Sequence, residues 1–151
     1  MAEPSPMERR LTLRLLTYWD DLRGDRPMPR ENEIDPEVIA DLWDNCFLIQ
    51  VRDIVKSDYN YTYLGSAIRD AYTGGFAGER EPTPLVSPNA SKLEMHYAKV
   101  IATCKPVLEE GEFPNLSGDI VKFRQCMLPL GSGNEVESIF GGMRFKIFPA
   151  K

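Results

Sequence analysis

Histidine, paired cysteines and long apolar runs are scarce in this chain of 151 residues. It contains one histidine, His96, and three widely spaced cysteines, Cys46, Cys104 and Cys126. A single histidine leaves little to activate a Ser or Cys nucleophile, and the dispersed cysteines lack the spacing of a CxxC metal site or a disulfide framework. We therefore expect no metal site, and we expect the three thiols to be reduced and part of the core.

Membrane-spanning runs and basic clusters are absent as well. No apolar run approaches the roughly 18 residues of a membrane span, and the N-terminus lacks the layout of a signal peptide. The formal net charge is -5, and the longest basic run is Arg9-Arg10. Because a phosphate backbone is bound by clustered Lys and Arg, these patterns predict a cytoplasmic protein without a membrane segment or a nucleic-acid partner.

The first third of the chain predicts helices. After a Pro-rich start expected to be disordered (residues 1–6), residues 7–23 carry apolar side chains at spacings of three and four, with charged residues between them. Gly24 would end this amphipathic helix. Asp35-Pro36 then predicts a second helix to about Asn45, with Asp35 as N-cap and proline in the first turn. Residues 7–45 are thus expected to form a helical extension.

The rest of the chain predicts strands interrupted by helices. Two strands over 46–55 and 59–64 would form a hairpin, Gly65 would end the second strand, and a short helix would follow over 67–72. Glycines at 74, 75 and 78 mark a second corner, and a longer helix is predicted from 88 to about 104. Three extended segments complete the pattern, at 106–113, 119–130 and 135–148.

This order of elements resembles that of the PAS sensor domains. The resemblance spans roughly Leu15 to Lys146. Among PAS proteins, the chain resembles the short stand-alone PAS-like proteins common in alphaproteobacteria. The motifs that carry it are Trp19, the Arg23…Pro27…Arg30 linker, Asp35-Pro36, Tyr63-Leu64-Gly65, the Gly74-to-Gly78 turn and Leu128-Pro129-Leu130. The resemblance implies an α+β fold in which residues 46–148 form a PAS-like five-stranded antiparallel sheet with helices on one face, after the N-terminal amphipathic helices.

The resemblance also implies a sensory or regulatory role without a catalytic set. Pockets of this fold lie between the inner sheet face and the middle helices. The candidates for the pocket lining are Phe47, Ile49, Tyr63, Ile68, Tyr72, Tyr97, Ile101, Met127 and Phe145. The alternative is that these side chains only fill the core. The tyrosines favour a cavity, because a buried phenol needs a hydrogen-bond partner that a ligand or water can supply.

No cofactor is assigned from the sequence. Heme-binding PAS domains take their axial histidine from the long helix before the last three strands, and His96 lies in such a helix, although at the edge of its apolar stripe. A packed structural histidine is the favoured interpretation. Flavin photochemistry is disfavoured, because nothing matches the Asn-Cys-Arg-Phe run of such light sensors.

Two further hypotheses concern partners and catalysis. The stripe of Leu11, Leu15, Trp19 and Leu22 can pack on its own sheet or against a second copy, and we expect a homodimer that signals to a separate protein partner. The rival to a sensor is a small hot-dog or cone-like enzyme that uses Asp70 or Glu79 as base on an acyl substrate. Since the sequence shows only scattered carboxylates, we expect no enzyme.

Overall fold

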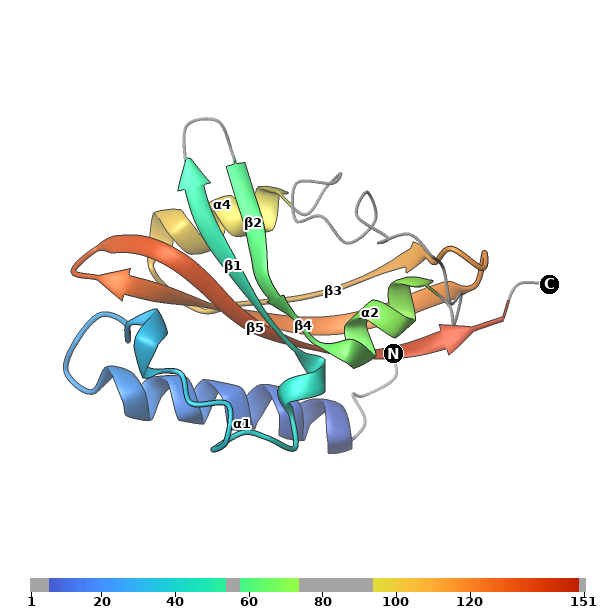
Figure 1. Cartoon of the computed structure of the whole chain (residues 1–151), viewed down its shortest axis with the longest axis horizontal. Coiled ribbons are helices and arrows are strands. Elements are labelled where there is room, and N and C mark those ends of the chain that lie inside the picture. The colour runs from blue at the N-terminus through green and yellow to red at the C-terminus, as the bar shows by residue number, and fades with distance from the viewer. Residues whose placement is uncertain (1–5, 54–57, 74–93, 150–151) are drawn as a thin grey trace.

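The computed structural model describes residues 6–53, 58–73 and 94–149, which form a five-stranded antiparallel sheet with helices on both sides (Figure 1). The strand order is β2-β1-β5-β4-β3. The strands are β1 (Cys46–Asp53), β2 (Asp58–Leu64), β3 (Val107–Pro114), β4 (Ile120–Ser132) and β5 (Glu135–Phe148). The α+β class, the antiparallel sheet and the N-terminal helix are therefore confirmed.

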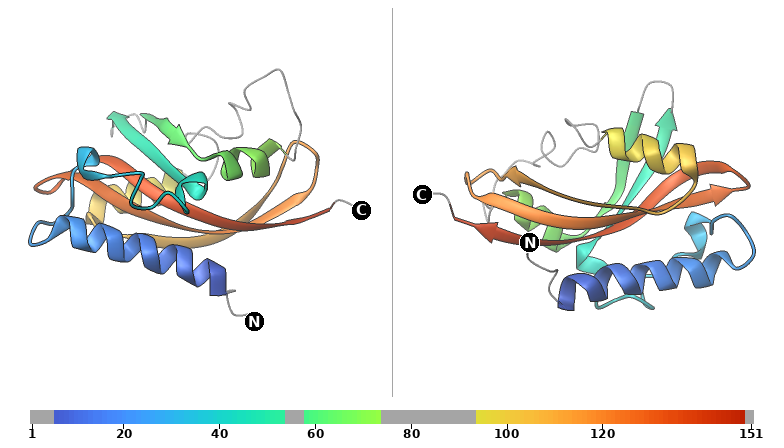
Figure 2. Two further views of the ribbon diagram at one scale, coloured as in Figure 1. Left: turned by 60° about the horizontal axis from the view of Figure 1, so that its bottom comes forward. Right: turned by 180° about the vertical axis from the view of Figure 1, so that it is seen from behind.

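The two faces of the sheet carry different elements. Helix α1 (Pro6–Arg23) lies on one face, whereas α2 (Ser66–Thr73) and α4 (Glu94–Thr103) lie on the other (Figures 1 and 2). We call these the extension face and the helix face. Because side chains alternate along a strand, Gly142 of β5 belongs to the extension face and its neighbours Gly141 and Met143 to the helix face.

Strand β5 is the centre of the sheet. It pairs with β4 along its whole length, from Ile120 opposite Phe148 to Ser132 opposite Glu135. It pairs with β1 only as far as Gly142, which lies opposite Cys46. In the described part of the chain, the last residues of β5 therefore have a neighbouring strand on one side only.

Helix α1 forms where the sequence predicts it. Its apolar stripe is buried, with exposed fractions of 1% for Leu11, 0% for Leu15 and 6% for Trp19, whereas Leu13 on the opposite side is 65% exposed. Gly24 follows the last turn with a φ of +59°, a conformation that glycine adopts without strain. The amphipathic pattern thus decides both the extent of the helix and the side that it buries.

The prediction of a second helix, from Asp35-Pro36 to about Asn45, is wrong. The chain makes a short 3-10 turn, η1 (Glu31–Glu33), then turns over 36–42, and a second 3-10 turn, η2 (Trp43–Asn45). Backbone hydrogen bonds there join residues three apart, as from Leu42 N–H to the Ile39 carbonyl at 2.9 Å. Ile39 and Leu42 are both buried, and tight turns place side chains three residues apart on one side.

Gly65 ends β2 because no side chain fits there. A Cβ at this position would lie 2.2 Å from the Asp44 carbonyl oxygen, and the Gly65 N–H donates to the Cys46 carbonyl at 2.8 Å. The end of β2 therefore closes directly over the start of β1, and α2 follows at once. The second glycine corner at 74–78 and the start of the longer predicted helix lie outside the described residues, as do residues 1–5.

Candidate functional site

The predicted pocket residues, with one exception, lie on the helix face or on the helices that cover it. Phe47 and Ile49 come from β1, Met127 from β4 and Phe145 from β5. Helix α2 contributes Ile68 and Tyr72, and α4 contributes Tyr97 and Ile101. All are buried except Ile101 and Phe145, which are half-buried at the edge of the core. The structure thus brings eight of the nine candidates into one layer.

Tyr63 is the exception and corrects the prediction. It lies opposite Leu48 on the extension face, where its ring stacks on Trp43 with a centroid distance of 4.3 Å and its hydroxyl donates to the Trp43 carbonyl at 2.9 Å. The register between β1 and β2 shifts after Leu48, so that Ile49 lies opposite Tyr61. This irregularity breaks the simple alternation of the tyrosines and removes Tyr63 from the pocket list.

Polar groups interrupt the apolar helix face at one end. Gln125 is 5% exposed, and its Nε2 donates to the Glu109 carboxylate on the neighbouring strand β3. Tyr72 stacks on Phe113 with a centroid distance of 4.4 Å. Burial raises the pKa of Tyr72 to about 12, and the negative charge of Glu109 adds to the rise. A carboxylate, an amide and a phenol therefore occupy a surface that is otherwise built for packing.

The β3–β4 turn adjoins this polar group and is tied to α2. Asn115 is buried, and its Oδ1 accepts the N–H groups of Ser117 and Asp119, each at 3.0 Å. The N–H of Leu116 donates to the Tyr72 carbonyl at 3.0 Å. The Nδ2 of Asn115 is buried without a hydrogen-bond partner among the described residues. The end of α2 and the turn are therefore joined by a backbone hydrogen bond.

The extension face is closed by the chain's own helix. Gly142 makes room for Leu15, since a Cβ on this glycine would lie 2.3 Å from the Leu15 Cδ1. Cys46 and Cys126 flank Gly142 in register and are fully buried. Of the four residues proposed for a partner interface, Leu11, Leu15 and Trp19 are buried against the sheet and Leu22 is half-buried. Three of the four side chains are thus packed within the chain and are not exposed to a second copy.

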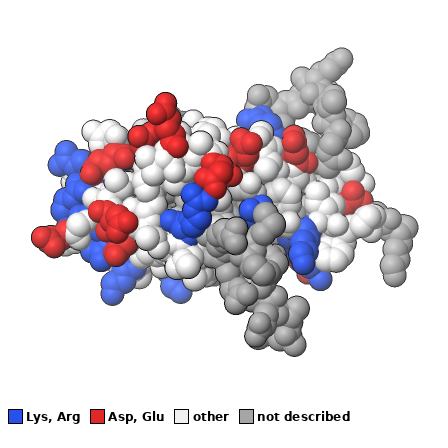
Figure 3. Space-filling model, turned by 90° about the horizontal axis from the view of Figure 1, so that it is seen from below, with Lys and Arg blue, Asp and Glu red and all other residues white. Residues whose placement is uncertain are grey.

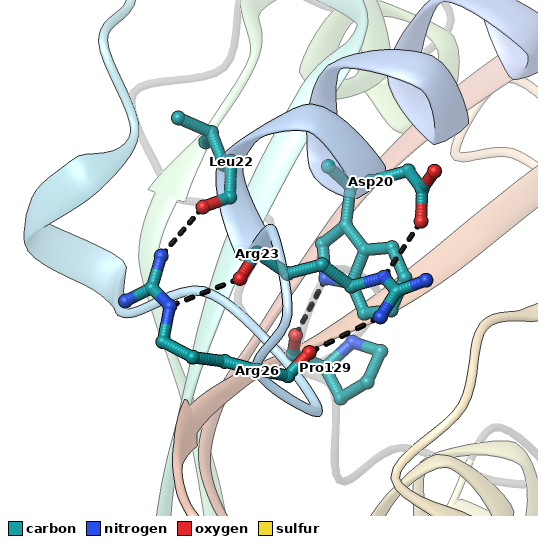
Figure 4. Close-up of polar contacts among 6 residues, drawn as sticks. Asp20, Leu22, Arg23, Arg26 and Pro129 are labelled. Carbon is teal, nitrogen blue, oxygen red and sulfur yellow. Dashed lines mark hydrogen bonds and ion pairs between the residues drawn. The ribbon is translucent and has the colours of Figure 1, made fainter.

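A tryptophan fastens the end of α1 to the β4–β5 hairpin, and two arginines hold the turn that follows the helix (Figure 4). The indole N–H of Trp19 donates to the Pro129 carbonyl at 2.8 Å, in a buried contact. The Arg23 guanidinium lies 5.4 Å from the centroid of the indole ring and pairs with Asp20 at 2.6 Å. Arg23 and Arg26 also donate to one another's carbonyls, at 3.1 and 3.0 Å, which closes the turn after the helix.

The segment after this turn continues along the hairpin. The Gly131 N–H donates to the Pro29 carbonyl at 2.9 Å, and the Ser138 hydroxyl donates to the Glu31 carboxylate at 2.8 Å. Arg26 binds both oxygens of Glu33, at 2.7 and 2.9 Å. This hydrogen bonding, together with the backbone N–H of Arg30, lowers the pKa of Glu33 to about 2. Acidic and basic side chains are interspersed across this side of the molecule (Figure 3).

Comparison with known families agrees with this geometry. A family model described as PAS domain matches residues 7–144, which is nearly the whole chain. The chain belongs to the PAS domain family. No curated protein matches it. The family match includes α1, the turns after it and the sheet as far as Arg144 in β5.

The remaining sequence candidates are exposed or lie outside the described residues. Asp70 is exposed on α2, and Glu79 lies outside the described residues. His96 lies in α4, but its side chain is outside what the structure describes. In the described part of the chain, no group of His, Cys, Asp and Glu could hold a metal ion, and no helix is long and apolar enough to span a bilayer.

Proposed function

We propose that this PAS domain is a non-enzymatic, cytoplasmic sensor, which binds a small organic ligand and signals to a separate protein. The observation that supports a ligand best is the polar group formed by Tyr72, Glu109 and Gln125 on the helix face. A core that serves only for packing gains nothing from buried polar groups, because each must be desolvated. A ligand with hydrogen-bonding groups would use them, as in most small-molecule sites.

The central strand offers a route for the signal. Gly141 and Gly142 are neighbours on β5, yet the first accommodates Phe47 on the helix face and the second Leu15 on the extension face. Close-packed interiors transmit small displacements, because they have few voids to absorb them. A ligand that moves β5 from the helix side would therefore shift α1, and a partner protein would detect the new position of the extension.

Native mass spectrometry of protein purified from its own host tests the ligand. We expect a retained organic mass in the wild type, and about tenfold weaker retention in Glu109→Gln, because hydrogen bonds to charged groups are worth about 1.5 to 3 kcal/mol. Glu110→Gln is the matched control, since Glu110 is the next residue of β3 and faces the other side of the sheet. Absence of a retained mass, together with no stabilisation by any compound in a metabolite screen, would contradict a ligand sensor.

The homodimer remains a prediction. Its interface would have to be formed by a surface other than the apolar stripe of α1. Multi-angle light scattering on the whole chain tests it, because a monomer has a mass of 17.2 kDa and a dimer twice that value. A monomer mass at all accessible concentrations would remove the dimer from the proposal and leave the ligand site unaffected.

A further inference from the structure

Four basic side chains form a square on the extension face, toward the end of β5. Lys122 lies opposite Lys146 across the β4–β5 pair, and Arg124 lies opposite Arg144. We call these four residues the basic square. Like charges directly opposite one another on adjacent strands destabilise a sheet. The arrangement therefore has a local cost, and packing does not require it because all four side chains are exposed or half-exposed.

Strand β3 offsets one side of the basic square. It places Glu110 opposite Arg124 and Glu112 opposite Lys122. Arg124 and Glu110 form an ion pair at 3.2 Å. Glu110 is thus paired with Arg124, and Glu112 lies opposite Lys122 on the β4 side of the square.

The β5 side has no such counterpart. The pairing of β1 with β5 stops at Gly142, so no acidic strand lies beside Arg144 and Lys146 in the described part of the chain. Neither residue makes an ion pair with the described residues, and the Nε of Arg144 is buried there without a hydrogen-bond partner. Four positive charges against two negative ones leave a surplus of positive charge at this place, in a protein whose net charge is -5.

The surface is hollowed where the surplus lies. A groove of about 360 Å³ crosses the three strands and is lined by Glu110, Glu112, Lys122, Arg124, Lys146 and Phe148. The Lys122 Nζ lies 5.0 Å from the centroid of the Phe148 ring, which is itself 45% exposed. The last part of β5 runs past the beginning of α1 in the ribbon views (Figures 1 and 2).

We propose that this groove binds an extended acidic segment of a partner protein. Carboxylates of the segment would contact Lys122 and Lys146, which line the groove, and Arg144, which lies beside it on β5. An apolar side chain next to these carboxylates would pack on Phe148. The inference rests on the proposed function, which requires a protein partner, and adds the chemistry by which that partner is recognised. Charge complementarity of this kind mainly provides specificity and rapid association.

The charges favour this occupant over two others. A second copy of the chain would bring together two faces that each carry surplus positive charge, while Glu110 is already paired with its own Arg124. A nucleic acid or another polyphosphate would place dense negative charge against Glu110 and Glu112. An acidic peptide avoids both conflicts, because its carboxylates are spaced by other side chains.

Fluorescence anisotropy tests the proposal on the full chain. The probe is a fluorescein-labelled octapeptide of alternating Glu and Leu, at low salt of about 50 mM, where screening is weaker. The double variant Arg144→Gln/Lys146→Gln should bind about tenfold more weakly than the wild type. The control Lys99→Gln/Lys105→Gln removes the same charge from two exposed residues, one within α4 and one just after it, and should bind as the wild type does.

The outcomes separate this inference from the ligand proposal. Amide chemical shifts that change over residues 144–148 on addition of the peptide, and are absent with an octapeptide of alternating Lys and Leu, would support the groove and check that each variant is folded. Equal weakening in both double variants, no binding by the wild type, or preferential binding of an oligo-dT probe would overturn it. Glu109→Gln should leave peptide binding unchanged, so that a failed ligand site and a failed groove give different results.

Discussion

The two faces of the sheet are packed in different ways although they share the same central strand. On the extension face, α1 fills the surface with Leu11 and Leu15, and its polar contacts lie around the margin. On the helix face, the polar group of Glu109 and Gln125 lies within the packed layer itself. The part of the extension face under α1 is thus closed by apolar packing, whereas the helix face keeps polar groups inside its packed layer.

The largest effect on stability is expected when the centre of the apolar stripe of α1 is removed. Leu15→Ala deletes a side chain that is 0% exposed, and we expect it to lower the free energy of unfolding by about 3 kcal/mol. Leu13→Ala on the same helix removes a side chain that is 65% exposed and should stay within about 0.5 kcal/mol of the wild type. Urea unfolding followed by tryptophan fluorescence measures both. Equal effects would mean that α1 does not seal the sheet.

The reactivity of the buried thiols reports on how completely α1 covers the sheet. Burial raises the pKa of Cys126 to about 12 and that of Cys46 above its ordinary range, so neither should react in the native protein. Cys104 is half-exposed and should be alkylated first. If Cys126 reacts only after the structure opens, Leu15→Ala should accelerate its labelling about a hundredfold at neutral pH. Mass spectrometry of iodoacetamide-treated protein distinguishes the sites, and an unchanged Cys126 rate would show that its protection does not depend on α1.

The margin of the extension face gives a smaller effect. Trp19→Phe keeps an aromatic ring but leaves the buried Pro129 carbonyl without its donor, so we expect a loss of about 1 to 2 kcal/mol in unfolding free energy. Tyr18→Phe is the control on the same helix. It removes a hydroxyl that accepts the Asp35 N–H at 2.7 Å in an exposed setting and should cost less. A larger loss in Tyr18→Phe than in Trp19→Phe would contradict the importance of the buried contact.

The order of elements could be predicted because it depends on local patterns. The stripe of α1, the glycine corner at Gly65 and the last hairpin all follow from residues close together in the sequence. The helix predicted over 35–45 failed where local pattern and packing disagree: capping residues favour a helix, but Ile39 and Leu42 are buried by successive tight turns. The assignment of Tyr63 to the pocket failed because a single register shift moves a side chain to the opposite face of the sheet.

The site could be predicted only in part. The apolar candidates were recognisable from the resemblance, but the contact between Trp19 and Pro129 joins residues 110 positions apart, and no local signal announces it. The basic square has a visible trace, since Lys122 and Arg124 alternate around Phe123, and Arg144 and Lys146 around Phe145. Only the register of the β4–β5 hairpin shows that the four charges lie opposite one another.

The smallest predicted effect concerns the exposed ion pair that follows α1. Hydrogen bonds from Arg26 are the main cause that lowers the pKa of Glu33 to about 2, from an ordinary value of 4.5. A carboxylate with a lowered pKa in the folded state stabilises that state above the unfolded pKa, and the contribution is lost as the pH falls toward 2. Because the pair is exposed, Glu33→Gln should lower the melting temperature by no more than about 2 °C at pH 7.

The difference in melting temperature between Glu33→Gln and the wild type should depend on pH. The melting temperatures of Glu33→Gln and the wild type should converge between pH 4.5 and about 2, the interval in which the folded and unfolded carboxyl groups differ in protonation. Glu37→Gln removes an exposed carboxylate from the same segment and should show no such convergence, because no ion pair joins Glu37 to the described residues. Differential scanning calorimetry from pH 7 to 2 measures this. A constant offset between Glu33→Gln and the wild type would mean that Arg26 holds Glu33 through packing, and that charge is not involved.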